Sequence, residues 1–251
     1  MDKHIKLIFL SDTHLGFDFP IRPRIKRRRR GDDFIDNFKR VLKYAVKTRA
    51  DGVIHGGDVF FRSRVPKQIV ELVYSILLNF SQYNIPIFLV PGNHERSRLP
   101  NPELLADPNI RVFDKPRSYT LNGELRLQIS GFPYHRNSIR SQIGDVIGEL
   151  QNDQKEVDFR VLCMHQLIEG ATIGPSNYMF RHASDVIRVE DLPAEFPLIL
   201  SGHIHRRQLL VKNGEKRENS QIVVFSGSTE RTSFAEKDEP KGFFEFVIGK
   251  K

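Results

Sequence analysis

Short apolar runs alternate with two longer segments of helical periodicity in the first part of the chain. Residues 5–10, 53–54 and 86–90 form apolar runs typical of buried strands. Between these runs, apolar residues recur at helical spacing from Asp32 or Asp33 to about Arg49, and from Pro66 to Phe80. The order strand, helix, strand, helix, strand predicts an α/β sheet with parallel strands and right-handed crossovers.

The pattern changes after Ile110, where strand-like runs follow one another without long helices between them. Asn122-Gly123 separates two of these runs and is typical of a hairpin turn. Residues 138–151 show helical spacing, although two glycines weaken it. The expected strands of this part are residues 111–113, 119–121, 125–130, 159–164, 197–200, 208–212, 222–225 and 243–248. No linker interrupts the chain, and we expect residues 1–251 to form one domain without a capping domain.

Composition narrows the class of protein. The chain has 251 residues, 39% of them hydrophobic and 28% charged, which suits a globular protein. No apolar run approaches the roughly 20 residues that a membrane helix needs. The single cysteine, Cys163, excludes an intramolecular disulfide and favours a reduced, cytoplasmic compartment. A net charge of +8 favours a polyanionic partner, with nucleic acid first and a membrane surface second.

The positive charge is concentrated between Ile21 and Arg30. The cations of this segment are Arg22, Arg24, Lys26, Arg27, Arg28, Arg29 and Arg30. Guanidinium groups match phosphate oxygens in bidentate geometry, so the segment is a candidate phosphate-binding arm. A solvated loop is the alternative. Arg136 is a further candidate for substrate contact, with a plain loop role equally open.

Polar residues follow directly after five of the apolar strand-like runs. These clusters are Ser11-Asp12-Thr13-His14, His55-Gly56-Gly57-Asp58, Pro91-Gly92-Asn93-His94-Glu95, His165 and Ser201-Gly202-His203-Ile204-His205. The carboxyl ends of strands form the ligand-binding edge of open α/β sheets. We therefore expect the five clusters to converge on one site.

The side chains of these clusters are typical metal ligands. The candidates are Asp12, His14, Asp58, Asn93, His165, His203 and His205. If Asp58 bridges two metals, the set supplies four bonds to each and leaves room for water and substrate. Oxygen and imidazole ligands without thiolate suit manganese, iron or zinc better than calcium or magnesium.

Taken together, Asp-x-His, Gly-Asp, Gly-Asn-His, a lone His and Gly-His-x-His resemble the signature of calcineurin-like metallophosphoesterases. The resemblance spans residues 5 to about 248. Within that superfamily the chain is most similar to the core of the Mre11/SbcD-type DNA repair nucleases. The segments that carry this similarity are residues 11–16, 56–60, 90–94 and 226–234, with Lys241-Gly242.

The resemblance implies a four-layer αββα sandwich with mixed sheets and two metal ions, manganese in this branch. It assigns Asp12, His14 and His205 to one metal, and Asn93, His165 and His203 to the other, with Asp58 bridging. Metal-activated hydroxide would attack phosphorus in line, and His94 would assist by protonating the leaving oxygen or stabilising charge.

Three functions remain open at this point. A metal-dependent DNA phosphodiesterase acting in DNA repair or processing fits the nuclease-like motifs and the basic charge. A hydrolase of small phosphodiesters or phosphomonoesters is the alternative, and a non-catalytic scaffold is the third. Phe61 favours the second, because the nuclease group commonly has His or Asp there. Glu95 also departs from the group, which usually has Asp after Gly-Asn-His.

The resemblance also bears on partners. The chain ends about where the nuclease core of that group ends, so we expect no obligatory complex with a Rad50/SbcC-like ATPase. DNA is the expected partner, and a membrane is not. Nuclease relatives often dimerise through helices near the Gly-Asn-His segment, so a homodimer is also an expectation.

Overall fold

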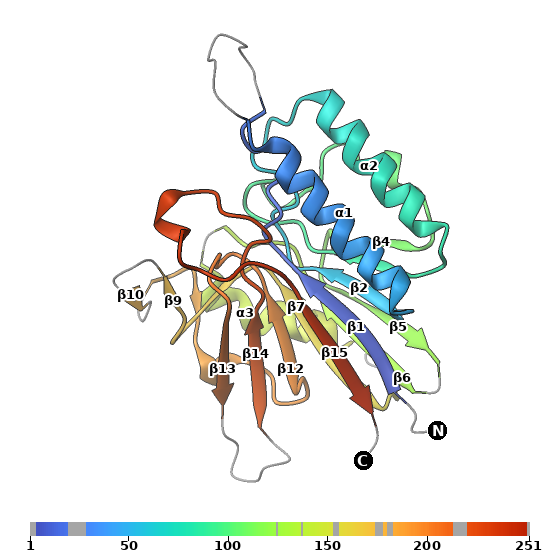
Figure 1. Cartoon of the computed structure of the whole chain (residues 1–251). Coiled ribbons are helices and arrows are strands. Elements are labelled where there is room, and N and C mark those ends of the chain that lie inside the picture. Colours follow the sequence, from blue (N-terminus) through green and yellow to red (C-terminus); the bar gives the residue numbers. More distant parts are fainter. Residues whose placement is uncertain are drawn as a thin grey trace.

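The computed structural model describes residues 4–19, 29–123, 125–136, 138–152, 156–173, 178–179, 183–212 and 220–249. Within these ranges the chain forms two large β-sheets packed face to face, with helices on both outer faces (Figure 1), and two small sheets of two strands each. The expected single domain of residues 1–251 stays a prediction.

The first sheet has five strands in the order β15-β1-β2-β3-β4. Four of them are parallel: β1 (His4–Leu10), β2 (Gly52–His55), β3 (Ile87–Leu89) and β4 (Ile110–Val112). The last strand of the chain, β15 (Phe244–Gly249), pairs antiparallel with β1. The parallel sheet that the sequence predicts is therefore present, with β15 added at its edge.

The second sheet has six strands in the order β13-β14-β12-β7-β6-β5. The hairpin of β5 (Arg117–Asn122) and β6 (Arg126–Gly131) lies at one edge. Parallel strands β7 (Phe159–Met164), β12 (Leu198–Ser201) and β14 (Gln221–Phe225) follow β6. The antiparallel strand β13 (Gln208–Lys212) lies at the other edge. Both sheets are mixed, as expected.

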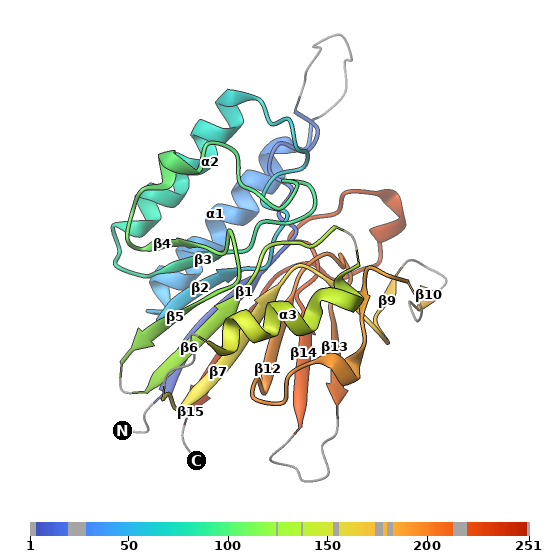
Figure 2. The same ribbon diagram turned by 180° about the vertical axis from the view of Figure 1, so that it is seen from behind.

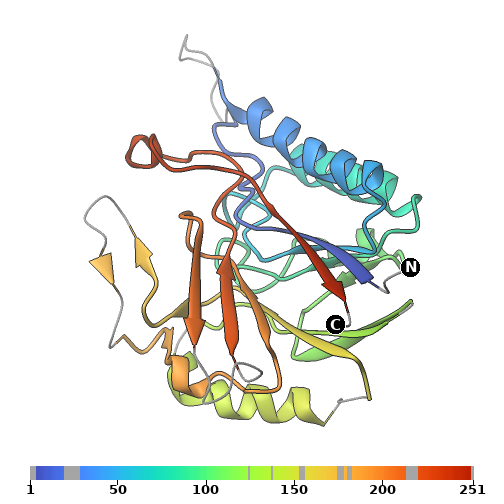
Figure 3. The ribbon, with the colours of Figure 1, turned by 60° about the horizontal axis from the view of Figure 1, so that its bottom comes forward.

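Three helices cover the outer faces. Helices α1 (Gly31–Lys47) and α2 (Lys67–Ser81) lie side by side on the first sheet, and α3 (Ile139–Gln151) covers the second, as Figures 2 and 3 show from two directions. Helix α1 begins at Gly31 and ends at Lys47, one to two residues from the predicted ends. Pro66 is the N-cap of α2 rather than its first residue.

Alternation along the strands sorts the core into three layers. In β1, Leu7 and Phe9 face the second sheet, whereas Ile8 and Leu10 pack against α1 and α2. In β7, Cys163 lies between the sheets and its thiol is buried, which raises its pKa. Because successive side chains of these strands enter apolar layers on both faces of the sheet, the sequence of each buried strand is a continuous hydrophobic run. The αββα arrangement implied by the resemblance is confirmed.

Short elements escaped the sequence pattern. The strands β8 (Leu167–Ile168), β9 (Thr172–Ile173), β10 (Tyr178–Met179) and β11 (Val186–Ile187) pair only with one another. Two-residue strands show no periodicity, so no pattern could predict them. Single-turn 3₁₀ helices lie at Pro102–Leu105, Val189–Asp191 and Phe234–Glu236.

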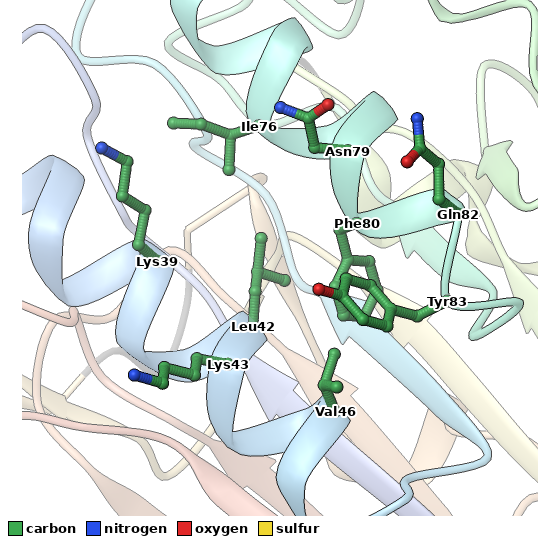
Figure 4. Close-up of a pocket in the computed structure, with 9 residues that line it drawn as sticks. All are labelled: Lys39, Leu42, Lys43, Val46, Ile76, Asn79, Phe80, Gln82 and Tyr83. Atoms are coloured by element: carbon green, nitrogen blue, oxygen red, sulfur yellow. The ribbon is translucent and has the colours of Figure 1, made fainter.

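A groove of about 630 Å³ lies between the outer surfaces of α1 and α2 (Figure 4). Leu42, Ile76 and Phe80 line it together with Lys39 and Lys43. None of the candidate metal ligands lines this groove. Among the described residues, no helix is long and apolar enough to cross a membrane.

Candidate metal centre

The five polar clusters that follow strands meet at one edge of the molecule. Asp12 follows β1, Asp58 follows β2 and Asn93 follows β3, all in the first sheet. His165 follows β7 and the segment of His203 and His205 follows β12, both in the second sheet. Side chains from both sheets therefore converge where the parallel strands end, as the strand-end argument predicts.

Asp12, His14 and His205 form a first cluster, here named the Asp12 cluster. Their ligating atoms lie within 4.8 Å of one another. The Nε2 atoms of His14 and His205 are 2.8 Å apart, and Nε2 of His205 is 3.9 Å from Oδ1 of Asp12. Ser11 donates a hydrogen bond to the other carboxylate oxygen of Asp12 at 2.5 Å. One oxygen of Asp12 is thus committed to Ser11, and the other is directed toward the histidines.

Asn93, His165 and His203 form a second cluster, the Asn93 cluster. The side-chain oxygen of Asn93 lies 2.9 Å from Nε2 of His165 and 2.8 Å from Nδ1 of His203. The Nδ1 atom of His165 lies 2.7 Å from the carbonyl oxygen of Gly56. Donation from Nδ1 to that carbonyl leaves Nε2 of His165 free to bind a cation.

Asp58 lies between the two clusters. Its Oδ1 is 3.4 Å from Nε2 of His165, and its Oδ2 is 4.0 Å from Nε2 of His14. Asp58 is 2% exposed, so water screens the charge of its carboxylate only weakly. Burial alone would raise the pKa of Asp58, but the surrounding histidines, His165 foremost, hold it well below its usual range.

Four of these residues adopt the left-handed backbone conformation. The φ angles are 51° at Asp12, 44° at His14, 54° at Asp58 and 81° at His203. Residues other than glycine rarely adopt this conformation, and such strain clusters at functional sites. Gly92 contributes a different constraint, because a Cβ there would overlap the backbone nitrogen and the carboxylate of Asp58. The loops after β2 and β3 can approach this closely only with glycine at that position.

The histidines differ in protonation. Burial lowers the pKa of His203 to about 3, and it also lowers that of His14. Burial would lower the pKa of His165 too, but the Asp58 carboxylate raises it to about 9. Burial likewise opposes the charge on His205, but the hydrogen bond to Glu236 raises its pKa. Neutral His14 and His203 are in the form that binds metal.

The donor set fits divalent cations. The amide oxygen of Asn93 faces ring nitrogens of His165 and His203, and Oδ1 of Asp12 faces Nε2 of His205, so each cluster brings an oxygen ligand and imidazole ligands together. Oxygen and nitrogen ligands in this proportion suit manganese, iron or zinc. The ligating atoms of Asp58 lie close to those of His14 and His94 on one side and to those of Asp12 and His165 on the other, so this carboxylate lies where two metal ions could share it.

His94 lies at the open side of the centre. Its backbone N–H donates to Asp58 Oδ1 at 3.0 Å, and its Nε2 is 3.7 Å from Asp58 Oδ2. Its Nδ1 contacts the carbonyl oxygen of Phe61. Phe61 lacks the polar side chain common in the nuclease group, yet its backbone carbonyl orients the imidazole of His94.

Glu95 and His55 are buried beside the centre and have structural partners. The Glu95 carboxylate accepts hydrogen bonds from the backbone N–H of Phe60 at 2.6 Å and of Gly92 at 2.8 Å. Burial and the nearby Asp58 raise its pKa to about 8. His55 contacts the Thr13 hydroxyl at 2.9 Å. These contacts join the loops that carry Asp12, Asp58 and Asn93.

Glu236 is a residue of the site that the sequence pattern missed. Its Oε1 lies 3.0 Å from Nδ1 of His205, and its Oε2 lies 2.6 Å from Nζ of Lys241. Thr232 donates a further hydrogen bond to Oε1 at 2.6 Å. Burial alone would raise the pKa of Glu236, but the bonds from His205, Lys241 and Thr232 lower it. The only sequence signal was the similarity of residues 226–234 and Lys241-Gly242 to the nuclease group.

The predicted substrate arginines occupy different positions. Arg27 and Arg28 lie outside the described residues. Arg29 is 3.5 Å from Asp18, and Arg30 is 2.8 Å from Glu230, so both guanidinium groups have acidic partners. Arg136 lines a cavity of about 400 Å³ beside Asn93. Their role in substrate binding stays a prediction.

Comparisons with known proteins agree with this geometry. Residues 5–207 match the family described as calcineurin-like phosphoesterase. The chain is 29% identical over 245 residues to the DNA double-strand break repair protein Mre11 of Methanocaldococcus jannaschii, covering 94% of this chain and 61% of that protein. It is also 29% identical over 248 residues to the Mre11 protein of Methanosarcina mazei, covering 97% of this chain and 36% of that protein. The chain therefore spans less than two thirds of the length of these relatives.

Solved structures support the fold. A dimetal phosphatase from Danio rerio superposes with a TM-score of 0.59 at 10% identity, covering 89% of this chain and 87% of that one. A protein of Thermus thermophilus gives a TM-score of 0.55 at 11% identity, covering 90% of each chain. Fold, convergent ligands and family match lead to one conclusion: the chain belongs to the calcineurin-like phosphoesterase family.

Proposed function

We propose that this metallophosphoesterase is a two-metal DNA nuclease of the Mre11/SbcD type that acts in DNA repair or processing. The observation that carries the proposal is the convergence of Asp and His ligands from both sheets, in a chain similar over almost its whole length to Mre11 proteins. The net charge of +8 supports a polyanionic substrate.

The proposed ligands follow the two clusters. The Asp12 cluster would hold one metal ion and the Asn93 cluster the other, with Asp58 shared between them. Manganese is the proposed metal, with iron or zinc as alternatives. Two divalent ions in such a site supply charge for the phosphate oxygens and lower the pKa of water, so that hydroxide can attack phosphorus.

His94 is the proposed general acid. Its Nδ1–H donates to the Phe61 carbonyl, and this bond fixes the ring with Nε2 toward the centre. The protonated imidazole can then donate the Nε2 proton to the oxygen that leaves phosphorus. General acid catalysis of this kind contributes roughly 10²–10⁴-fold to the rate.

Hydrolysis of small phosphodiesters or phosphomonoesters is the second candidate. Phe61 favours it, because the nuclease group commonly has a titratable side chain at this position. The ring of Phe61 packs edge-on against His14 at 5.9 Å, so it occupies space beside the centre without offering a proton.

A paired assay with Mn²⁺ distinguishes the two candidates. One reaction contains end-labelled single- and double-stranded DNA, and the other contains bis-p-nitrophenyl phosphate. The nuclease proposal expects DNA cleavage that falls steeply with salt, because each phosphate contact releases counterions. Cleavage of the small ester alone would overturn the DNA assignment and leave the second candidate. The Asp58→Asn variant controls for a contaminating enzyme in both reactions.

A further inference from the structure

A cavity of about 400 Å³ opens directly beside the Asn93 cluster. Asn93, Arg96, Ser97, Tyr134 and Arg136 line it. Its volume lies within the range of roughly 300–1,000 Å³ typical of small-ligand sites. Asn93 belongs to both the cavity lining and the Asn93 cluster, so a substrate larger than one phosphate group can extend from the centre into this cavity.

The two loops that form the cavity are joined by hydrogen bonds. The backbone N–H of Tyr134 donates to the carbonyl of Pro91 at 2.9 Å, and the Ser97 hydroxyl donates to the carbonyl of Tyr134. Arg96 and Ser97 both have left-handed φ angles, of 53° and 64°. A segment held in this strained conformation by its neighbours keeps the backbone of Arg96 at a fixed place on the rim, from which its side chain lines the cavity.

The charge of the cavity is positive. Arg96 and Arg136 are exposed, and neither guanidinium has a carboxylate within 4.0 Å among the described residues. Burial raises the pKa of Tyr134, and the charges of Asp185 and of the buried Asp58 raise it further, whereas Arg136 lowers it. The arginines of the predicted basic arm differ, because Arg29 and Arg30 are already paired with Asp18 and Glu230.

The aromatic ring of Tyr134 lies between the cavity and the histidines of the Asn93 cluster. Its ring stacks on His203 with centroids 5.6 Å apart and meets His165 edge-on at 6.0 Å. Asn93 belongs both to the Asn93 cluster and to the cavity that Arg96 and Arg136 line. A phosphodiester next to the one at the metal centre would therefore lie beside these two arginines.

We infer that this cavity binds the phosphodiester that neighbours the scissile one, through Arg96 and Arg136. The inference rests on the proposed nuclease function and assigns the part of the substrate that these arginines recognise. A small phosphate ester has no second phosphate, so this site would favour nucleic acid over small esters.

Neutral linkages test the inference. Trithymidylate has two phosphodiesters, and either one can be replaced by an uncharged methylphosphonate, which leaves one cleavable bond with a neutral neighbour. With Mn²⁺ and the wild-type chain, we expect the replacement on one side to lower kcat/KM by about tenfold, a typical effect of a charge-assisted hydrogen bond. In the double variant Arg96→Gln/Arg136→Gln the same replacement should lower kcat/KM by about twofold or less.

The control is Arg126→Gln. Arg126 is exposed and begins β6, at the end of that strand far from the metal centre. This variant should keep the tenfold discrimination. Equal discrimination in the wild type and the double variant would overturn the site, as would a wild type that ignores the neutral linkage on both sides. A wild type that hydrolyses bis-p-nitrophenyl phosphate but no oligonucleotide would instead overturn the nuclease proposal, and this site with it.

Discussion

The two clusters of the metal centre are held in place by different kinds of contact. In the Asn93 cluster, His165 is fixed by a backbone carbonyl, that of Gly56, and the glycines around it leave no free space. In the Asp12 cluster, His205 is fixed by the side chain of Glu236, which Lys241 and Thr232 hold in turn. One cluster depends on main-chain packing, and the other depends on a network of charged side chains.

The origin of each contact in the chain explains the difference. Gly56 and Gly202 directly follow β2 and β12, so the strands of both sheets themselves bring His165 into position. Glu236 belongs to the long segment between β14 and β15, and Arg30, the N-cap of α1, anchors that segment through Glu230 at 2.8 Å. The Asp12 cluster can therefore lose its support without a change in either sheet, whereas the Asn93 cluster cannot.

Asp58→Asn should have the largest effect, because Asp58 contacts both clusters. The amide keeps the shape but loses the charge that His14 and His165 face, so both proposed metal sites weaken together. We expect kcat/KM for bis-p-nitrophenyl phosphate with Mn²⁺ to fall by about 10³-fold or more, which corresponds to about 4 kcal/mol of lost transition-state stabilisation. Steady-state kinetics and Mn²⁺ titration calorimetry measure the two effects. A variant with near-normal kinetics would show that Asp58 is not shared.

His94→Gln should separate catalysis from metal binding. The Nε2 proton matters most when the leaving oxygen is a poor leaving group, as in DNA. We therefore expect a loss of about 10²–10³-fold on an oligonucleotide and a much smaller loss on bis-p-nitrophenyl phosphate, whose phenolate leaves without a proton. Mn²⁺ affinity should change little, because His94 is outside both proposed ligand sets. Equal losses on the two substrates would contradict the general-acid role.

Much of the centre could be predicted from the chain because strands and ligands are adjacent in sequence. Asp12, Asp58, Asn93, His165 and His203 each follow a strand by a few residues, so a correct prediction of the strands places them at one edge. The left-handed backbone at Asp12, His14 and Asp58 could not be predicted, because those residue types do not require it. It follows from hydrogen bonds between loops, such as that from His14 N–H to the Asp58 carbonyl at 3.0 Å.

Contacts between segments that are distant in sequence could not be predicted either, because no sequence pattern relates their residues. Glu236 lies 31 positions from His205 in sequence, and no periodicity relates the two. The basic run predicts Arg30 as a substrate contact, which stays a prediction, and it gives no sign that Arg30 also pairs with Glu230 of a segment near the other end of the chain. A charge pattern shows that a residue is cationic; the fold determines which acidic group it meets.

Gly202→Ala should damage the Asn93 cluster through packing. A Cβ at this position would lie 2.6 Å from Nδ1 of His165 and would clash with the Gly56 carbonyl that Nδ1 contacts. We expect a loss of about 1–3 kcal/mol in the free energy of unfolding, from overpacking, and binding of one Mn²⁺ in place of two.

Thermal unfolding and metal analysis check this prediction for Gly202→Ala. Gly144→Ala in α3 is the matched control, because nothing lies within 4 Å of its added Cβ. That variant should gain about 0.5–1 kcal/mol from its better helix propensity. Normal stability and two bound Mn²⁺ ions in Gly202→Ala would show that the loops move apart at little cost.

Glu236→Gln should weaken the Asp12 cluster while leaving the sheets intact. Glutamine keeps the length of the side chain and can still accept a hydrogen bond from His205, but it removes the negative charge that orients the imidazole. Loss of such an outer partner typically lowers metal affinity by about 10–100-fold. We expect about a tenfold weaker binding of one Mn²⁺ in calorimetry, with the other unaffected.

Glu239→Gln is the control, because Glu239 contacts Lys241 and Arg206 of the same region but not His205. Equal weakening of Mn²⁺ binding in both variants would mean that the segment between β14 and β15 supports the centre as a whole, without a specific role for Glu236. The contrast between the Asn93 cluster, held by the main chain, and the Asp12 cluster, held by side chains, would then not hold.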